Sequence, residues 1–395
     1  MKPVFRNPAD LRFDGEAVEN AWITLVLAAD RHEYGGAVAL VARRGEIGLY
    51  RATGWAVREP EDHRSPMGVD AIFDLASLTK VTATTPSILR LVAEGQIALD
   101  QPVGEILTEF GNDGAKAGVT IERLLTHSGG FRDWIPVFLD DQGEQAYIEA
   151  FAASQPEWEP NTRVVYSDPS FITLGAVVHR VTGETVDVYA KREVFDPLGM
   201  VDTMYCPPRS LRRRIVGTEV GNSFEAQKMA SGRTPVVGPW RDRLIRGQVH
   251  DGNAWYGLGG VAGHAGLFGT AVDLFRYGQM WLNGGVLGEI RVLPRSLVSE
   301  ATVNHTRFED PTDVRGYGWR LLPPPGSPEV SPDSGRGLSQ RAFGHTGFTG
   351  TSLWIDPERD LLVVLLTNRV HPTVTPEYME TRARFTAAIA GAVRE

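Results

Sequence analysis

The chain has 395 residues, of which 42% are hydrophobic and 23% charged, and its formal net charge is −9. These proportions are typical of a soluble globular protein, and the length predicts one large domain or two interleaved domains. The acidic balance gives no electrostatic reason to bind nucleic acid or anionic lipid. A single cysteine, Cys206, excludes an internal disulfide and a multi-thiolate metal site.

The N-terminal part of the chain predicts a helix, a β-hairpin and a second helix. Apolar residues at helical spacing indicate a helix over 14–33. Apolar runs over 36–42 and 47–56 are separated by a short polar turn with a glycine, which is typical of a β-hairpin. The second helix is expected to begin at Ser77, and Pro86 should kink it because proline removes one backbone donor.

The middle of the chain has a mainly helical pattern. Periodic apolar residues predict short helices over 120–125, 142–153, 171–181, 186–195, 270–282 and 294–303. The helical period is lost over 206–266, which is rich in glycine, proline and arginine. A loop section of this length in a compact enzyme usually forms a wall of the binding site.

Strand patterns return near the C-terminus. The predicted elements there are three strands and a closing helix, over 342–345, 351–355, 361–367 and 377–393. Strands near both ends and helices between them predict an α+β fold with one antiparallel sheet flanked by helices. The expected units are a discontinuous sheet subdomain, 1–75 with 310–395, and a mostly helical subdomain, 76–309, with the active site between them.

Ser77 and Lys80 form the first motif that carries chemistry. They are three residues apart at the start of a predicted helix, which places hydroxyl and amine on one face about 5–6 Å apart. A serine hydroxyl needs an adjacent base to become a good nucleophile, and a helix N-terminus suits a developing oxyanion. Ser-x-x-Lys also occurs by chance in many helices. The motif gains weight from Tyr166-Ser167-Asp168 and His345-Thr346-Gly347, which follow downstream.

These three ordered signatures resemble those of penicillin-recognising serine hydrolases of the class C β-lactamase type. That superfamily also holds D-alanyl-D-alanine carboxypeptidases, D-amino-acid peptidases and esterases. The resemblance runs from about Gly35 to the C-terminus and includes the flanking segments 124–130, 259–268, 345–351 and 366–369. It implies a β-lactamase/transpeptidase-like fold and acyl transfer through a covalent intermediate on Ser77. It also implies an oxyanion hole formed by the backbone N–H groups of Ser77 and Phe348.

Lys80 and Tyr166 are the expected proton carriers. In water their pKa values would be about 10.4 and about 10, too high for a base at neutral pH. If the two side chains lie side by side in a cleft, the Lys80 ammonium favours the phenolate form of Tyr166, whereas desolvation favours the neutral amine of Lys80. The pair then shares one proton, and the sequence leaves open which of the two accepts it from Ser77.

Two residues depart from the superfamily pattern. Asp168 stands where asparagine is usual; a carboxylate can hold Lys80 as an ion pair and repels an anionic substrate. His345 stands where lysine is usual and would be mostly neutral at pH 7. Losing a charge-assisted hydrogen bond to a substrate carboxylate costs about 1.5–3 kcal/mol. Both departures disfavour β-lactam turnover and favour a neutral ester or a non-carboxylate amide.

Further substrate-binding candidates are Thr346, Gly347 and His264. Thr346 can donate a hydroxyl, and Gly347 lets the strand backbone approach closely. His264 lies in a glycine-rich loop with histidine and aspartate nearby, where a loop-bracing network is an equal alternative. Their spacing is not that of a zinc site, and no metal or cofactor is expected. His127 is expected to be a structural histidine bonded to nearby backbone.

The sequence therefore predicts a serine hydrolase that cleaves an ester or amide in a small-molecule or peptide substrate, as an esterase, D-amino-acid peptidase or carboxypeptidase. One alternative is a true β-lactamase or penicillin-binding DD-peptidase, and another is a catalytically silent binding or scaffold protein. The sequence shows no membrane span and no signal-peptide pattern. This predicts a cytoplasmic location, or export if a leader has been trimmed, and leaves the oligomeric state open.

Overall fold

The computed structural model describes residues 3–111, 116–230, 238–308, 313–327, 335–375 and 377–394. Part of the section predicted as loops, 231–237, lies outside these residues. Among the helices of the described ranges, none combines the length and the apolar content needed to cross a bilayer.

The centre of the fold is a seven-stranded antiparallel sheet with the strand order β11-β12-β13-β14-β1-β2-β3. Its strands are β1 Gly36–Arg43, β2 Glu46–Val57, β3 Ser65–Pro66, β11 Arg320–Leu321, β12 Phe343–Thr346, β13 Ser352–Asp356 and β14 Leu361–Thr367. β1 pairs with β14 along its length, from Ala37 opposite Thr367 to Arg43 opposite Leu361. The two ends of the chain thus meet inside one sheet, and the predicted hairpin, C-terminal strands and α+β fold are confirmed.

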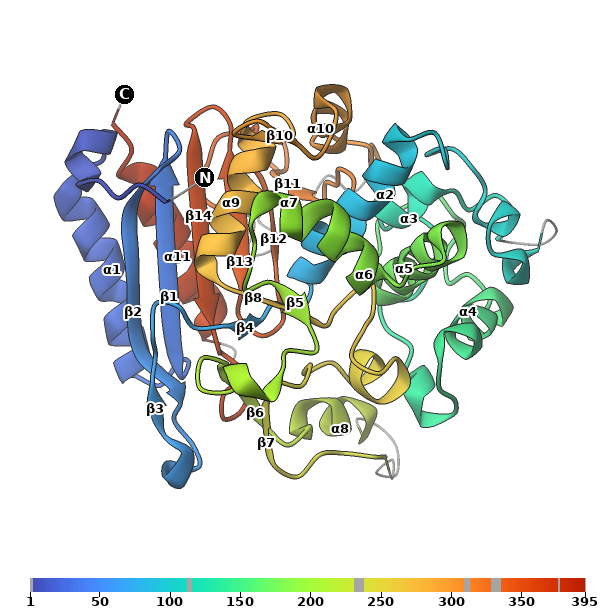
Figure 1. Ribbon diagram of the computed structural model, residues 1–395, viewed down its shortest axis with the longest axis horizontal. Coiled ribbons are helices and arrows are strands. Elements are labelled where there is room, and N and C mark those ends of the chain that lie inside the picture. Colours follow the sequence, from blue (N-terminus) through green and yellow to red (C-terminus); the bar gives the residue numbers. More distant parts are fainter. Residues whose placement is uncertain are drawn as a thin grey trace.

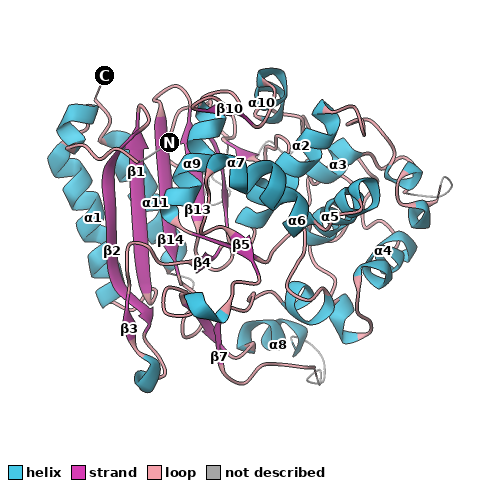
Figure 2. Ribbon diagram, viewed as in Figure 1, coloured by secondary structure: helices cyan, strands magenta, loops and turns pink. Residues whose placement is uncertain are grey.

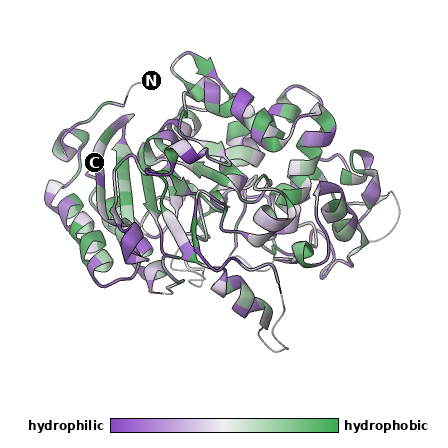
Figure 3. Ribbon diagram, turned by 60° about the horizontal axis from the view of Figure 1, so that its bottom comes forward, coloured by the Kyte–Doolittle hydropathy of each residue, from purple (hydrophilic) through white to green (hydrophobic). Residues whose placement is uncertain are grey.

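Helices cover both faces of this sheet (Figure 1). α1 (Gly15–Asp30) and α11 (Tyr378–Gly391) pack on one face, and α9 (Ala271–Leu282) packs on the other. Successive strand side chains point to opposite faces. Ala39 therefore belongs to the core with α1 and α11, whereas Leu40 belongs to the core with α9. Burial on both sides explains why the central strands are continuously apolar, as Figure 3 shows.

The other half of the molecule consists mainly of helices and loops (Figure 2). Its helices are α2 Thr85–Ala93, α3 Ile121–Leu125, α4 Glu144–Ala153, α5 Asp168–Thr182, α6 Val186–Ala190, α7 Asp196–Leu198, α8 Ser223–Ala230 and α10 Arg295–Ala301. Short strands form three small sheets: β4 Phe73–Asp74 with β8 Leu267–Gly269 and β5 Met204–Tyr205, β6 Gly217–Val220 with β7 Leu244–Arg246, and β9 Val286–Leu287 with β10 Ile290–Arg291. The subdomain boundaries at 75/76 and 309/310 stay a prediction, and α9 packs on the sheet although it lies within 76–309.

The prediction that the section over 206–266 consists of loops is wrong in part, because the section contains α8 as well as β6 and β7. The helix Ser223–Ala230 has a mixed polar sequence with little periodicity. The Glu219 carboxylate accepts a hydrogen bond from the Phe224 N–H at 2.9 Å and so satisfies one of the free donors at the start of this helix. The helix therefore depends on a residue outside it, which a periodicity argument does not detect.

The irregularity in the helix after Ser77 differs from the kink predicted at Pro86. The helix begins at Leu78, passes through a π-helical turn over Lys80–Thr84 and continues as α2. Pro86 lies in the first turn of α2, directly after the wide turn. Proline has no N–H, so Pro86 would interrupt a regular helical hydrogen-bond ladder at this point. The π-helical turn lies where that interruption would fall. The irregular turn contains Lys80 itself.

Candidate active site

Ser77 lies in the turn between β4 and the following helix. The preceding residue, Ala76, has φ +46°, in the left-handed region that a residue with a side chain rarely adopts. The Asp74 carboxylate stabilises this turn by accepting the Ala76 N–H at 2.9 Å. Strained backbone of this kind persists where the surroundings enforce it, and it is common at functional sites.

Lys80 is fully buried and its ammonium touches three oxygens. Its Nζ lies 3.0 Å from Ser77 Oγ, 2.7 Å from Asp168 Oδ1 and 3.2 Å from the His264 carbonyl oxygen. Burial alone would lower the pKa of Lys80, but the Asp168 carboxylate and the Tyr166 phenol outweigh it and raise this pKa above its ordinary value. The resting site therefore holds Lys80 as an ammonium paired with Asp168.

Tyr166 is positioned by the start of α5. Ser167 caps that helix by accepting the Ser170 N–H, and its own N–H donates to His127 Nδ1 at 3.0 Å. The His127 ring packs 4.7 Å from the Tyr166 ring, so His127 braces the site from behind. Burial, followed by nearby cations, lowers the pKa of His127 well below its usual range, and the ring is neutral. The Tyr166 hydroxyl has no hydrogen-bond partner among the described residues.

Two cations lie over the Tyr166 ring. Lys80 Nζ is 4.8 Å from the ring centroid, and the Arg315 guanidinium carbon is 5.4 Å from it. Arg315 is buried and paired with Asp313 at 2.7 Å. Cations at this range are attracted to the electron-rich face of an aromatic ring.

The β12 segment supplies His345, Thr346 and Gly347 behind the nucleophile. His345 Nδ1 lies 2.8 Å from the Thr346 carbonyl oxygen, which can only accept, so Nδ1 carries the proton. Burial, with Arg315 and Lys80 nearby, lowers the pKa of His345 well below its usual range. A Cβ added to Gly347 would lie 2.5 Å from the Leu75 carbonyl oxygen, so only glycine allows this close approach.

The predicted oxyanion donors are available. Within the described part of the chain, neither the Ser77 N–H nor the Phe348 N–H donates to a protein acceptor. The Thr349 hydroxyl donates to the Asp74 carbonyl oxygen at 2.7 Å, which ties the Phe348 loop to the Ser77 turn. An oxyanion hole requires free N–H groups held in fixed positions, and this hydrogen bond joins the two segments that carry them.

Ser77 opens onto a cleft of about 220 Å³. Its lining residues are Asp74, Ala76, Ser77, Asp133, Trp134, Tyr166, Asp168, Phe224, Glu225, Lys228, Val249, His250, Asp251, His264, Ala265 and Phe348. Half of these come from the section over 206–266, so this section forms a wall of the cleft, and its role in substrate binding stays a prediction. Of the predicted site residues, Lys80 and His345 lie buried behind the cleft, and Thr346 and Gly347 do not line it.

The sequence argument missed several cleft residues, notably Glu225, Asp74 and Trp134. Glu225 lies on the unpredicted α8, and its carboxylate accepts the Gly252 N–H at 2.8 Å. Burial, followed by the charge of Asp251, raises the pKa of Glu225 to about 7. If α8 had been recognised in the sequence, Glu225 would have been a candidate, because it is an acidic residue on a helix that faces a glycine-rich loop.

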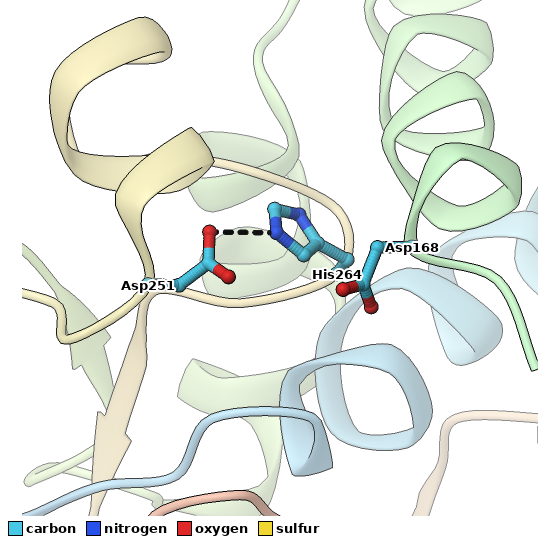
Figure 4. A group of neighbouring side chains, drawn as sticks. All are labelled: Asp168, Asp251 and His264. Atoms are coloured by element: carbon cyan, nitrogen blue, oxygen red, sulfur yellow. Dashed lines mark hydrogen bonds and ion pairs between the residues drawn. The ribbon is translucent and has the colours of Figure 1, made fainter. Parts of the chain in front are cut away.

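The buried His264 and the partly buried Asp251 form a second pair beside Asp168 (Figure 4). His264 Nε2 lies 2.9 Å from Asp251 Oδ1. Burial would raise the pKa of Asp251, but the His264 imidazole lowers it to about 2, so this carboxylate is ionised. One ligand atom each of Asp168, Asp251 and His264 lie within 4.8 Å of one another, close enough to share a metal ion. In this arrangement, however, Asp168 is neutralised by the Lys80 ammonium.

A serine hydrogen-bonded to a buried lysine, set beside an antiparallel sheet that is covered by helices, is the arrangement expected of a serine hydrolase of the β-lactamase/transpeptidase fold. Residues 22–388 match the family model described as Beta-lactamase, and the chain belongs to this family.

A relative from Escherichia coli (strain K12), named provisionally as a D-alanyl-D-alanine carboxypeptidase, is 32% identical over 329 residues, which cover 78% of this chain and 71% of the relative. A penicillin-binding protein homologue from Caulobacter crescentus has a similar structure, with a TM-score of 0.72, 22% identity and coverage of 95% of this chain and 98% of that one. EstCE1, described as a hydrolase with promiscuous acyltransferase activity, is also similar, with a TM-score of 0.71, 20% identity and coverage of 95% and 99%.

Proposed function

We propose that the protein hydrolyses esters or amides through an acyl-enzyme on Ser77, with Lys80 and Tyr166 as the proton-handling groups. The observation that carries the proposal is the 3.0 Å contact between Ser77 Oγ and the buried Lys80 Nζ, together with the N–H groups of Ser77 and Phe348, which have no acceptor among the described residues. A catalytically silent scaffold would have no need to keep a buried ammonium against a serine hydroxyl, because burying a charge is costly.

In the first step, Ser77 Oγ bonds to the substrate carbonyl carbon while its proton passes to the Tyr166–Lys80 pair. The carbonyl oxygen becomes an oxyanion that accepts the N–H groups of Ser77 and Phe348. The C–O or C–N bond then breaks and the leaving group takes the proton. Water attacks the acyl-enzyme, its proton returns through the same pair, and the free acid and Ser77 are released.

Tyr166 is the proposed acceptor of the Ser77 proton. The ion pair with Asp168 holds Lys80 in its charged form, which cannot accept a proton. The charged Lys80 and Arg315 lie 4.8 Å and 5.4 Å from the Tyr166 ring centroid, so two cations face the proposed proton acceptor. Lys80 then acts as a cation that lowers the barrier to proton transfer and returns a proton to the leaving group.

The preferred substrates are those without a carboxylate beside the scissile bond. His345 is neutral, so it offers no charge to a carboxylate, and the cleft is lined by Asp74, Asp168 and Asp251. A second candidate is a carboxypeptidase acting on D-alanyl-D-alanine peptides, which the name of the Escherichia coli relative favours.

The test is labelling with a fluorophosphonate, read by intact mass, with Ser77→Ala as the control. The wild type should gain one adduct and the variant none. Rates on p-nitrophenyl esters, nitrocefin and D-Ala-D-Ala peptides then separate the candidates. Absence of both labelling and ester hydrolysis would leave only a binding or scaffold role, and nitrocefin turnover equal to ester turnover would contradict the inferred substrate preference.

A further inference from the structure

A second pocket, of about 570 Å³, adjoins the Ser77 cleft, and Val249 lines both. It lies mainly between the segments 206–215 and 243–249. Four arginines line this pocket, which we call the arginine pocket: Arg209, Arg212, Arg243 and Arg246. Its described lining contains no aspartate or glutamate. In a chain with a net charge of −9, this local positive charge is opposite to the overall balance.

The arginine pocket has a packed apolar floor. Ile215, Val249 and Phe268 line it and are almost fully buried, at 1%, 3% and 1% exposure, in a small hydrophobic cluster of their own. Trp255 packs against the same cluster and adds aromatic surface to the lining. β7, which carries Arg246, is fixed by its pairing with β6 (Figure 1). The pocket is therefore shaped by packed side chains and a paired strand.

Backbone carbonyl groups hold two of the four arginines. Arg246 Nε donates to the Ile215 carbonyl oxygen at 2.7 Å, and its Nη2 donates to the Arg213 carbonyl oxygen at 3.2 Å. Arg212 Nη1 donates to the Arg246 carbonyl oxygen at 3.4 Å. Carbonyl oxygens orient a guanidinium, but they carry no full charge to neutralise it. Burial, followed by the charge of Arg212, lowers the pKa of Arg246, although the group stays charged.

The neighbouring Arg214 shows the contrast. Its guanidinium lies 2.7 Å from Asp202 and 2.9 Å from Asp70, so its charge is neutralised within the protein. Throughout the described ranges, no such carboxylate pairs with any of the four arginines of the pocket. Like charges held together without an acidic partner repel one another, and a bound anion would offset that repulsion.

We propose that the arginine pocket binds a small organic polyphosphate, at a site separate from the Ser77 cleft. A guanidinium is a planar fork that binds phosphate oxygens in pairs. A single carboxylate would neutralise one of the four charges, whereas a polyphosphate carries several negative charges. The apolar floor and Trp255 suit an apolar or aromatic group attached to the phosphates. The volume of about 570 Å³ lies within the roughly 300–1,000 Å³ of small-molecule sites.

The two neighbouring sites favour opposite charges. Carboxylates line the Ser77 cleft, among them Asp74, Asp168 and Asp251, so a polyphosphate is repelled from the cleft and attracted to the arginine pocket. Neither Ser77 nor Lys80 nor Tyr166 lines the arginine pocket. The inference therefore does not depend on the hydrolase function proposed above.

The test is isothermal titration calorimetry of the whole protein with ATP, tripolyphosphate and adenosine, without divalent cations. One ATP should bind per chain, tripolyphosphate should bind more weakly, and adenosine should not bind measurably. Arg212→Gln should weaken ATP binding about 10- to 100-fold, because it removes charge-assisted hydrogen bonds. Arg213→Gln is the matched control: it removes an equal charge from the next residue, which does not line the pocket, and should change Kd by less than about threefold.

A second control locates the ligand. Among the described residues that line the Ser77 cleft, Lys228 is the one with a permanent positive charge, and Lys228→Gln should leave the affinity for ATP unchanged. A loss of binding in Lys228→Gln would place the anion in the cleft and overturn the separate site.

The remaining outcomes also decide. If neither ATP nor tripolyphosphate binds the wild type, the proposal is wrong. Equal weakening by Arg212→Gln and Arg213→Gln would mean general attraction to a basic surface and would overturn the site as well. Tripolyphosphate binding as tight as ATP binding would refute the role of the apolar floor. Arg212 is exposed and its guanidinium makes one hydrogen bond within the described residues, so Arg212→Gln is expected to fold normally.

Discussion

Replacing Asp168 by asparagine removes the negative partner of Lys80 with little change of shape. Lys80 is fully buried and Asp168 is 18% exposed, so water does little to compensate for the loss. Removing one partner of a buried pair typically costs about 3–5 kcal/mol of unfolding free energy. For 395 residues unfolding as one unit, this corresponds to a fall in Tm of about 4–6 °C.

The loss should depend on pH in a defined direction. Asp168 and the Tyr166 phenol raise the pKa of folded Lys80 above the ordinary 10.5. Its stabilising contribution is therefore fully present below about pH 10.5 and is lost as the pH rises through the higher folded value. In Asp168→Asn, burial acts without the carboxylate and lowers the pKa of Lys80. The difference in unfolding free energy between the two proteins should be largest near pH 7 and shrink above pH 10.

Denaturant unfolding at pH 7 and pH 10.5, followed by fluorescence, measures both effects. Asp133→Asn is the matched control, because its carboxylate is 69% exposed and its pair with Lys228 is long, at 3.6 Å. That change should cost less than about 1 kcal/mol. If Asp168→Asn and the wild type unfold at the same denaturant concentration at pH 7, the ion pair does not stabilise the fold and the assigned charge state of Lys80 is wrong.

Three further changes test separate parts of the site. Tyr166→Phe should lower kcat on p-nitrophenyl butyrate about 10²–10⁴-fold with an unchanged circular dichroism spectrum, and near-normal kcat would remove Tyr166 from proton transfer. Gly347→Ala should lose about 1–3 kcal/mol in denaturant unfolding, because its Cβ meets the Leu75 carbonyl at 2.5 Å, whereas Gly391→Ala, with open space around it, should be neutral or stabilising. His345→Lys should raise the rate of acylation by a labelled penicillin about 10- to 100-fold, and an unchanged rate would show that charge at this position does not select substrates.

The main sheet could be predicted because its signals are local and strong. The runs over 36–42 and 361–366 are apolar throughout, and both are buried on both faces. The turn between β1 and β2 contains Gly45 at φ +76°, as expected for a tight hairpin. The order of strands near both ends of the chain predicts one shared antiparallel sheet, but the sequence does not encode locally which strand pairs with which, so the pairing of β1 with β14 was not predicted.

The site was predictable only where a motif fixed the spacing. Ser77 and Lys80 share a helix turn, so their contact follows from helical geometry. Asp168 reaches Lys80 from 88 residues away, and its role as the ion-pair partner followed from having a carboxylate in the Tyr166-Ser167-Asp168 motif. The bond from His264 to Asp251 joins two points of irregular loop, where no periodicity relates position in sequence to position in space.

The pairing of β1 with β14 has a consequence for how the protein is made. The β1–β2 hairpin is synthesised more than 300 residues before β14, because Ala37 of β1 pairs with Thr367 of β14. Until then one apolar edge of the hairpin has no hydrogen-bonding partner, and such an edge is prone to aggregation. Assembly of the sheet is thus a late event after synthesis, dominated by distant contacts and therefore slow. A nascent chain that stalls before residue 361 would contain the complete helix after Ser77, but the edge of β1 would stay unpaired and prone to aggregation.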